Sequence, residues 1–311
     1  MINETARIAV TSRTFCRSEK MCTELEKYFS NVKYNSEGLH FNENTLMEFL
    51  SNCEGAILSE EKLSKKVINN LPELKVVSKF GVGLDSIDVP HMQEKGISLK
   101  WKPGVNAASV AELSICYLIL ILREAQILNK SLTQGSWLQS TNSRNLSEVN
   151  IGILGFGQIG QKLAEYLKPF NSKILAHDEF IDSKIGLPDI EFVSFEELLE
   201  KSDAVSIHLP LNESTKGIIS HKELAMMKQD SVLINLSRGG IVDEDALYEA
   251  LLSQKLAGAA FDVFEEEPIE SSDLFSLKNF YCTPHIAGTS ISSTNALGLS
   301  AIEGLKEFFK E

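Results

Sequence analysis

Short apolar runs alternate with stretches of helical character along the first hundred residues of the chain. The runs are rich in valine, isoleucine, leucine and alanine, which is typical of strands buried on both faces of a parallel sheet. Strands separated by helical stretches predict parallel βαβ units. The predicted strands cover residues 7–11, 55–59, 74–79 and 96–101, and the predicted helices cover residues 22–29 and 45–50.

The same alternation resumes after a turn at Lys102-Pro103-Gly104. A long helix is predicted over residues 107–130, followed by a polar loop over residues 134–145. Within that helix, the run LSICYLILIL at 113–122 is too short to span a bilayer, so we expect it to be buried in protein. The later predicted strands cover residues 149–155, 173–178, 204–208, 231–235 and 256–261, and the later predicted helices cover residues 159–167 and 294–309.

Composition and net charge narrow the class of protein and the ligands that it can bind. The chain has 311 residues, of which 43% are hydrophobic and 23% charged, as expected of a soluble globular protein with one large or two medium domains. A formal net charge of -13 argues against a general nucleic-acid binder, because contacts to phosphates need a basic surface. The charge leaves room for a local basic pocket that binds a small anion.

Cysteine usage and the N-terminal segment bear on location. The five cysteines are odd in number and scattered, which predicts a reducing, cytoplasmic environment rather than a disulfide framework. They form no Cys-x-x-Cys pair of the kind that binds metal, so no metal site is predicted. The N-terminus lacks the apolar run of a signal peptide, and no membrane association is expected.

A glycine-rich turn stands where a dinucleotide would bind. The sequence GFGQIG at 155–160 follows a predicted strand and precedes a predicted helix, which is the context that gives the G-x-G-x-x-G pattern its meaning. Gly155 permits the tight turn, Gly157 lets the backbone approach a pyrophosphate, and Gly160 lets the helix pack on the strand. The phosphates would lie at the helix N-terminus, where amide groups and the helix dipole favour negative charge.

An acidic residue at the end of the next predicted strand indicates which dinucleotide is bound. Asp178 stands near the position expected for the acid that binds the ribose hydroxyls, and Glu179 adds negative charge that would repel a 2′-phosphate. The sequence therefore favours NAD over NADP. A purely structural strand–helix turn and another nucleotide such as FAD are the alternatives.

Three ionisable residues follow later strands of the same half of the chain. Arg238 follows the strand at 231–235, Glu267 follows the strand at 256–261, and His285 lies shortly before the last helix. Open α/β sheets bind ligands at the carboxyl ends of their strands, so we expect these residues to share a site.

These residue types suit hydride transfer to a 2-keto acid. A guanidinium can hold the carboxylate and polarise the keto oxygen. A histidine can protonate the developing alkoxide, and a carboxylate paired with it would raise its pKa. Each residue alone also fits a simpler explanation: a surface cation, an interior histidine, or part of the acidic run at 265–267. The prediction therefore depends on their joint placement.

Over essentially its whole length, the chain resembles the D-isomer-specific 2-hydroxyacid dehydrogenases. The segments that carry the resemblance are KFGVGLDSID (79–88), PGVNAASVAEL (103–113), ILGFGQIG (153–160), HLPLNEST (208–215), NLSRGGIVDEDAL (235–247), AAFDVFEEEP (259–268) and TPHIAG (283–288).

The resemblance implies the roles of individual residues. Arg238, Glu267 and His285 would form the catalytic triad, and the backbone amides of Val82 and Gly83 would grip the substrate carboxylate. The residues expected to contact the NAD are Gly155, Gly157, Gln158, Ile159, Gly160, Asp178, His208, Pro210, Thr215, Leu236, Ser237, Asp262 and Gly288.

The resemblance also implies a domain organisation. Two Rossmann-like, doubly wound domains are expected: a discontinuous substrate domain over residues 1–101 and 288–311, and an NAD-binding domain over residues 102–287. The active site would be the cleft between them, with closure excluding water. The family's usual homodimer, paired through the cofactor domains, is expected here.

Within the family, the chain looks most like the phosphoglycerate dehydrogenase and hydroxypyruvate/glyoxylate reductase branch. We expect a phosphoglycerate dehydrogenase-like activity first, with hydroxypyruvate/glyoxylate reduction as the alternative. One departure bears on this choice: Ile57-Leu58-Ser59-Glu60 replaces the V-R-S pattern of the phosphoglycerate enzymes, and Glu60 would repel a phosphate. Lys79, Lys100 or Lys102 could supply the missing cation in the substrate site.

Another class of function is also open at this stage. Corepressors related to this family share the fold, bind NAD and act through partners, and they keep the same triad. The absence of long extensions on this chain favours an enzyme. Formate and phosphite oxidation rank lower, because no match to their specialised substrate segments is evident.

Overall fold

The computed structural model describes residues 3–140, 142–181 and 189–310. Contacts divide the chain into two compact units, which comprise Met1–Asn106 with Ile291–Glu311, and Ala107–Ser290. The sequence-based boundaries at 101/102 and 287/288 differ from these by the short connecting segments 102–106 and 288–290. The structural boundaries coincide with the starts of two helices, α6 (Ala107–Leu122) and α12 (Ile291–Phe309).

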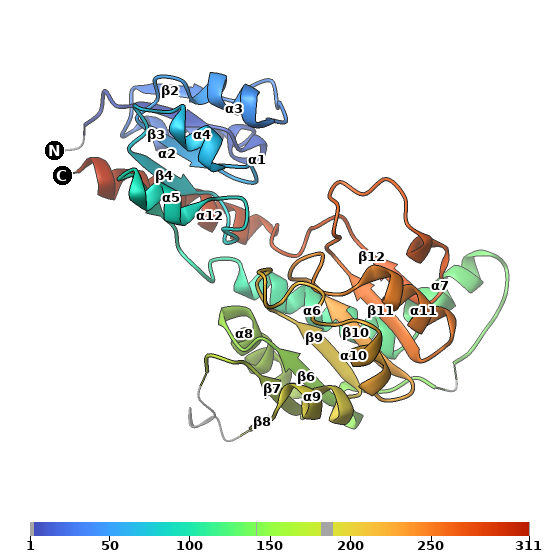
Figure 1. Ribbon diagram of the computed structural model, residues 1–311. Coiled ribbons are helices and arrows are strands. Elements are labelled where there is room, and N and C mark those ends of the chain that lie inside the picture. The colour runs from blue at the N-terminus through green and yellow to red at the C-terminus, as the bar shows by residue number, and fades with distance from the viewer. Residues whose placement is uncertain (1–2, 141, 182–188, 311) are drawn as a thin grey trace. The chain divides into compact units, whose positions relative to one another are not determined.

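The first unit, which contains both termini, is built on a five-stranded sheet (Figure 1). All of its pairings are parallel and the strand order is β2-β1-β3-β4-β5. The strands are β1 (Arg7–Val10), β2 (Asn31–Tyr34), β3 (Gly55–Leu58), β4 (Val76–Lys79) and β5 (Ser98–Lys100). Because successive side chains of a strand point to opposite faces, both faces of the central strands are buried, as the apolar runs predict.

Helices cover both faces of this sheet. On one face, α1 (Arg13–Cys16), α2 (Glu19–Glu26) and α12 pack on Ile8, Val10, Ile57 and Val76. On the other, α3 (Glu43–Leu50), α4 (Lys65–Asn69) and α5 (Val89–Glu94) pack on Ala9, Ala56, Leu58 and Val77. The C-terminal helix α12 thus completes a core that begins at the N-terminus, and the unit is discontinuous in sequence.

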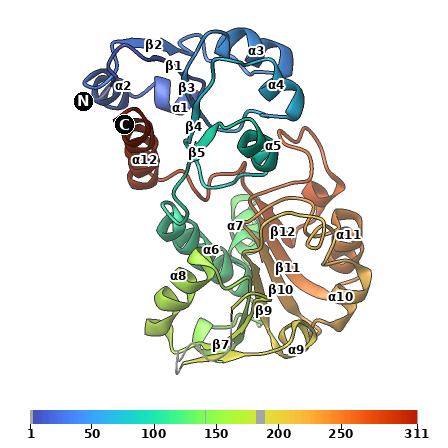
Figure 2. The same cartoon turned by 60° about the vertical axis from the view of Figure 1, so that its left-hand side comes forward.

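The second unit contains a seven-stranded sheet, again wholly parallel (Figure 2). Its strands are β6 (Asn150–Leu154), β7 (Lys173–His177), β8 (Ile190–Phe192), β9 (Ala204–Ile207), β10 (Ser231–Asn235), β11 (Leu256–Phe261) and β12 (Phe280–Cys282). The order β12-β11-β10-β9-β6-β7-β8 reverses direction at β6. In doubly wound sheets, ligands bind at this switch point, beyond the carboxyl ends of the strands.

Helices again cover both faces, in agreement with the predicted fold class. One layer contains α6 and α8 (Gln158–Leu167), and the other contains α9 (Phe195–Lys201), α10 (His221–Met226) and α11 (Glu244–Leu252). Among the described helices, none combines the length and apolar character that crossing a membrane requires.

The single long helix predicted over residues 107–130 is wrong. The chain forms α6 and then α7 (Ala125–Thr133), with Glu124 in a left-handed conformation (φ 51°) between them. α6 buries its apolar face, whereas α7 buries none of its residues, so nothing in this unit's core aligns α7 with α6. The predicted polar loop at 134–145 follows α7, and residue 141 lies outside the described residues.

Candidate active site

The glycine-rich turn connects β6 to α8. Gly155 has a φ of 94°, and a Cβ there would lie 2.6 Å from the carbonyl oxygen of His208. A Cβ on Gly160 would lie 2.3 Å from the carbonyl oxygen of Gly155, so the helix can approach the strand only with glycine at this position. A Cβ on Gly157, in contrast, would point into open space. The first and third glycines therefore serve the turn itself, and the middle one leaves the backbone exposed.

The N-terminus of α8 opens onto that space. Gly157 is the N-cap residue, and within the described chain no side chain caps the first turn, which contains Gln158 and Ile159. Backbone amides at the start of a helix bind anions well, because they lack partners in the helix and carry the positive end of its dipole.

Asp178, which follows β7, is bound directly to the glycine turn. Its Oδ2 accepts the amide of Phe156 at 2.8 Å, and its Oδ1 accepts the amide of Phe180 at 2.9 Å. The carboxylate predicted to bind ribose thus stands at the carboxyl edge of the sheet, beside the turn predicted to hold the pyrophosphate.

The segment after β9 lies against the same turn. The Nε2 of His208 is 2.9 Å from the hydroxyl oxygen of Ser206. Its buried Nδ1 has no hydrogen-bond partner among the residues that the structure describes. Burial lowers the pKa of His208 to about 3, so the ring is neutral at physiological pH. Further along, the Thr215 hydroxyl donates to the carbonyl of Pro210 at 2.6 Å and closes the loop that these residues share.

Arg238 is held by the turn that follows β10. The side-chain amide of the buried Asn235 donates to the Arg238 carbonyl at 2.9 Å, and its Oδ1 accepts both the amide and the hydroxyl of Ser237. The neighbouring Gly239 lies so close to the chain at Phe264 that a Cβ there would be 1.8 Å from the Phe264 carbonyl oxygen. The Arg238 turn therefore packs directly on the segment that leads to Glu267.

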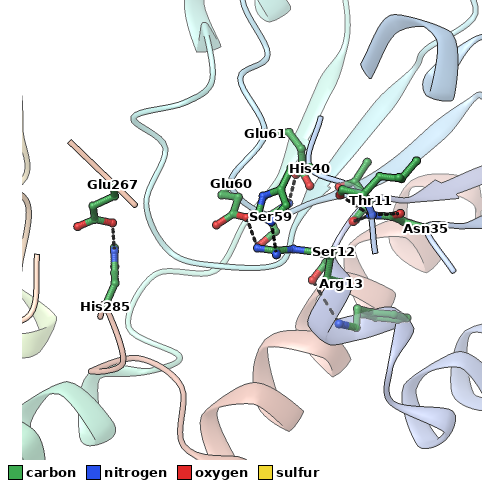
Figure 3. A network of polar contacts seen from close by, with 12 residues as sticks. Thr11, Ser12, Arg13, Asn35, His40, Ser59, Glu60, Glu61, Glu267 and His285 are labelled. Atoms are coloured by element: carbon green, nitrogen blue, oxygen red, sulfur yellow. Dashed lines mark hydrogen bonds and ion pairs between the residues drawn. The ribbon is translucent and has the colours of Figure 1, made fainter. Parts of the chain in front are cut away.

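Glu267 and His285 form a direct pair (Figure 3). The Nδ1 of His285 is 2.6 Å from Oε2 of Glu267. The other carboxylate oxygen, Oε1, accepts the amide of Phe264 at 2.9 Å, which fixes the orientation of the carboxylate. Half of the His285 side chain is exposed, so the ring can reach a ligand as well as Glu267.

The pairing shifts both pKa values in opposite directions. The hydrogen bond to Glu267 raises the pKa of His285, and this effect, together with the charges of Glu267 and Asp262, outweighs the lowering by burial and by Arg238. Burial alone would raise the pKa of Glu267, but the hydrogen bonds from His285 and Phe264 and the charges of His285 and Arg238 lower it overall. The imidazolium–carboxylate form is therefore stabilised.

The loop that carries His285 is held by Asp262, a fully buried carboxylate after β11. Its oxygens accept the hydroxyl of Thr283 and the amides of Ile286 at 2.8 Å and Ala287 at 2.7 Å. These contacts lie on both sides of His285, which has a left-handed φ of 52°. A buried aspartate thus satisfies the backbone of a conformation that non-glycine residues rarely adopt.

A tyrosine from α6 extends this hydrogen-bond network. The Tyr117 hydroxyl contacts the Thr283 hydroxyl. Because Thr283 donates its only hydroxyl proton to Asp262, the proton between these two oxygens comes from Tyr117. The Tyr117 ring is buried and packs edge-on against Tyr281, at 5.4 Å between ring centroids.

The predicted substrate-binding residues of the first unit lie at the carboxyl end of β4. Val82 follows that strand, and its carbonyl accepts the indole N–H of Trp101 at 2.8 Å. Gly83 is the next residue and is partly exposed. Lys79 is only 6% exposed, and its ammonium group donates to the carbonyl of Ser59. Lys79 is therefore built into this edge of the sheet and does not project from it.

Comparisons with known proteins show to which family the chain belongs. The family model described as "D-isomer specific 2-hydroxyacid dehydrogenase, NAD binding domain" matches residues 115–287. The hydroxypyruvate reductase of Thermotoga maritima is 34% identical over 94% of this chain and 95% of its own length. The chain belongs to the D-isomer-specific 2-hydroxyacid dehydrogenase family.

Other members of the family are named for different substrates. The D-3-phosphoglycerate dehydrogenase of Methanocaldococcus jannaschii is 33% identical over 85% of this chain, and the match spans 51% of that enzyme. The crystal structure of D-lactate dehydrogenase from Aquifex aeolicus, complexed with NAD and lactic acid, superimposes with a TM-score of 0.85 at 26% identity, over 97% of this chain and 95% of that one. The protein is thus an NAD-dependent oxidoreductase of this family.

The residues of the second unit fit NAD. The exposed backbone at Gly157 and the uncapped start of α8 suit a pyrophosphate, and Asp178 stands beside them. The buried Nδ1 of His208 offers a further polar contact to a bound dinucleotide. Leu236 and Ser237 precede Arg238 in its turn, and Gly288 follows the amide of Ala287 that Asp262 binds.

Three supporting residues were missed at the level of sequence. Asn235 and Thr283 stand inside segments that carry the family resemblance, but only the folded geometry shows what their side chains hold. Tyr117 lies within the apolar run LSICYLILIL. Its hydroxyl was the available signal there, because a buried tyrosine usually finds a hydrogen-bond partner.

Proposed function

We propose that the protein reduces small, unphosphorylated 2-keto acids of the hydroxypyruvate/glyoxylate type to D-2-hydroxy acids, and that Arg238, Glu267 and His285 are its catalytic residues. The observation that carries this proposal is the 2.6 Å contact between His285 and Glu267, with Arg238 close enough to influence the pKa of both. NAD in its reduced form supplies the hydride that C2 of the substrate receives.

The proton for the new hydroxyl group comes from His285. Nδ1 of the imidazolium is bound to Glu267, so proton transfer to the substrate oxygen takes place from Nε2. As the C2–O double bond becomes a single bond, the oxygen gains this proton and the imidazole becomes neutral. Glu267 stays ionised and holds the ring in place. In the oxidative direction the neutral ring takes the proton back.

Arg238 orients the substrate and polarises its keto oxygen. A guanidinium is always charged and donates along two parallel directions, which suits a carboxylate next to a carbonyl. The backbone amides of Val82 and Gly83 are proposed to bind the substrate carboxylate. Lys79 is proposed to support that edge through the Ser59 carbonyl and not to touch the substrate itself.

The preference for an unphosphorylated acid is supported by the charges at the end of β3. Glu60 and Glu61 follow that strand directly, where the phosphoglycerate enzymes typically carry an arginine. Glu61 is buried and accepts the amide of Ser59 at 2.7 Å, so it is fixed at this edge. Glu60 and Glu61 thus place two carboxylates at this edge, and the neighbouring cation Arg13 is already paired with Glu60 at 2.9 Å. This arrangement opposes a phosphate, and we therefore place the phosphorylated substrate second.

For the cofactor, we propose that Asp178 binds the ribose hydroxyls and that Gly157, Gln158 and Ile159 face the pyrophosphate. His208, Pro210 and Thr215 would follow the adenosine side. Leu236, Ser237, Asp262 and Gly288 would lie near the nicotinamide.

We also propose that the protein is a homodimer paired through its cofactor-binding unit. Exposed apolar residues on α7 and the segment after it support this assignment: Leu132 is 55%, Trp137 79% and Leu138 57% exposed. Large apolar groups gathered on one segment are typical of a surface that another protein covers. Light scattering coupled to gel filtration measures the mass directly, and a monomer at micromolar concentration would contradict the assignment.

A substrate panel tests the proposed function. NADH oxidation is followed with glyoxylate, hydroxypyruvate, 3-phosphohydroxypyruvate and pyruvate, and NADH binding is measured separately by fluorescence. We expect the highest kcat/KM with hydroxypyruvate or glyoxylate. If 3-phosphohydroxypyruvate is preferred, the substrate proposal is wrong. If NADH binds tightly but no acid is reduced, the enzyme assignment itself fails and a corepressor-like role gains support.

A further inference from the structure

Arg13, His40 and Glu60 form a polar cluster at the carboxyl edge of the first unit's sheet (Figure 3). Arg13 follows β1, His40 follows β2 and Glu60 follows β3. One terminal nitrogen of Arg13 is 2.9 Å from Oε1 of Glu60, and the other is 2.6 Å from Nε2 of His40. Because a guanidinium can only donate, Nε2 of His40 is the acceptor in this contact.

The backbone that presents this cluster is rigidly held. Asn35, only 3% exposed, donates from its side-chain amide to the carbonyls of Thr11 and Leu39, both at 2.9 Å, and accepts the amide of Leu39 at 2.8 Å. One buried side chain therefore ties together the segment that carries Arg13 and the segment that carries His40. The backbone on both sides of the Arg13 guanidinium is therefore fixed by hydrogen bonds.

Glu60, in contrast, is held loosely. Its side chain is 69% exposed, whereas that of Arg13 is 34% exposed. Exposed ion pairs contribute little net stability, because each charge retains much of its hydration. The Glu60 carboxylate therefore neutralises the charge of Arg13 but leaves the guanidinium partly exposed to a ligand.

The cluster lies on the edge that is proposed to receive the substrate. β3, which ends just before Glu60, lies between β1 and β4 in the sheet. The end of β4 leads to Val82 and Gly83. Neighbouring strands are about 4.8 Å apart, so the ends of β3 and β1 lie roughly 5 and 10 Å from that of β4. A charged group on C3 of a 2-keto acid bound at the end of β4 could therefore come close to Glu60 and to the long side chain of Arg13.

We propose that Arg13 and Glu60 form a charge gate that sets which side group the substrate carries on its keto carbon C2. This inference rests on the proposed function and deepens it. Glu60 repels a phosphate, sulfonate or second carboxylate and neutralises the one cation, Arg13, that this cluster contributes, while a neutral hydroxymethyl group or hydrogen passes. Substrate specificity then comes from the repulsion between Glu60 and substrates that carry an additional negative charge.

The gate predicts a gain of function. In Glu60→Gln the repulsion is removed and Arg13 is unmasked, so kcat/KM for 3-phosphohydroxypyruvate rises by about tenfold, equivalent to about 1.4 kcal/mol, while that for hydroxypyruvate changes by less than about twofold. The gain disappears in the double variant Glu60→Gln/Arg13→Gln. The exposed Glu48 on α3 provides the matched control, because Glu48→Gln changes the net charge equally without touching the gate.

A second measurement does not depend on turnover. Binding of 3-phosphoglycerate to the NADH complex is measured by calorimetry for the same three variants and the wild type. We expect tighter binding in Glu60→Gln alone, with a gain that shrinks as salt is added. An unchanged ratio of the two substrates with unchanged binding, or a gain that persists in the double variant, overturns the gate. If binding shifts as expected but no acid is reduced, the gate stands and the proposed function fails.

Discussion

The backbone amide of His285 donates to the carbonyl of Asp262 across 2.8 Å, while the carboxylate of the same aspartate binds the chain on either side of the histidine. Asp262 is fully buried, so its position is set by the core of the sheet. The histidine proposed to carry the proton is thus held through its backbone by one residue and through its ring by Glu267. Asp262 thus fixes the position of His285, and Glu267 stabilises the protonated form of its ring.

Replacement of Glu267 is expected to change the pH dependence. Glu267 raises the pKa of His285, so in the wild-type protein the imidazolium needed for reduction persists above the usual range of histidine. In Glu267→Gln that support is lost, and the alkaline limb of kcat for reduction moves to lower pH. The profile of kcat against pH measures this directly, and an unmoved alkaline limb would show that Glu267 does not set the protonation of His285.

The same pair should contribute to stability within a defined pH range. The pKa of His285 is raised in the folded state, so its contribution is fully present below the pKa of an unfolded histidine and disappears as pH rises through the folded value. Comparing Tm of the wild type and Glu267→Gln between pH 5 and pH 9 tests the sign. We expect the difference to shrink towards alkaline pH, and a difference that grows there would contradict the linkage.

Tyr117 is expected to act on His285 from a distance. In Tyr117→Phe the donor to Thr283 is lost, so the hydrogen-bond chain to Asp262 weakens and we expect unfolding to become easier by about 1 kcal/mol. Turnover should fall several-fold, with KM for NADH unchanged. Tyr281→Phe is the control, because it keeps the ring contact with Tyr117 and leaves the contact with Thr283 intact. Equal effects of both variants on kcat would remove Tyr117 from the positioning network.

The glycines of the turn should separate folding from cofactor binding. In Gly157→Ala the added methyl group meets open space, so Tm should change little while NADH binding weakens strongly. In Gly160→Ala the methyl group would meet the Gly155 carbonyl at 2.3 Å, so the protein should lose stability. Thermal unfolding and fluorescence titration of both variants provide the test. Gly157→Ala binding NADH as tightly as the wild type would mean that the pyrophosphate lies elsewhere.

Much of the fold could be predicted, because strands buried on both faces leave a continuous apolar run in the sequence. β3 and β10 are such strands and were found from that pattern. β2 and β8 were missed because they are edge strands: they are only half buried, and their sequences NVKY and IEF lack an apolar run. The break between α6 and α7 at Glu124 was missed for a different reason, since a left-handed residue without glycine gives no clear signal.

The candidate site shows the same division. Arg238, Glu267 and His285 could be predicted because each follows a strand of one parallel sheet. Within the second unit Glu267 and His285 are in direct contact, and the shared catalytic role of the three residues stays a prediction. What the sequence could not show is how they are supported. The contacts of Asp262 and Tyr117 join residues remote in the chain, and the local contacts of Asn235 to Ser237 and Arg238 depend on the geometry of the turn. The cluster of Arg13, His40 and Glu60 was hidden similarly, since it assembles from three separate strand ends.

Cofactor preference tests the assignment of Asp178. Its carboxylate stands beside the glycine turn, where it would accept ribose hydroxyls and repel a 2′-phosphate. Asp178→Ala should therefore lower the ratio of kcat/KM for NADH to that for NADPH. A ratio equal to that of the wild type would contradict the ribose role.

The most direct test of the proposed chemistry is His285→Ala, measured in one preparation for both kcat and the Kd of NADH. General acid catalysis by a positioned side chain typically contributes about 10²- to 10⁴-fold, so kcat for hydroxypyruvate should fall by at least about a hundredfold, while the Kd of NADH stays within about threefold. If kcat is preserved, or if kcat and NADH binding decline together, His285 is not the proton donor and the proposed mechanism is wrong.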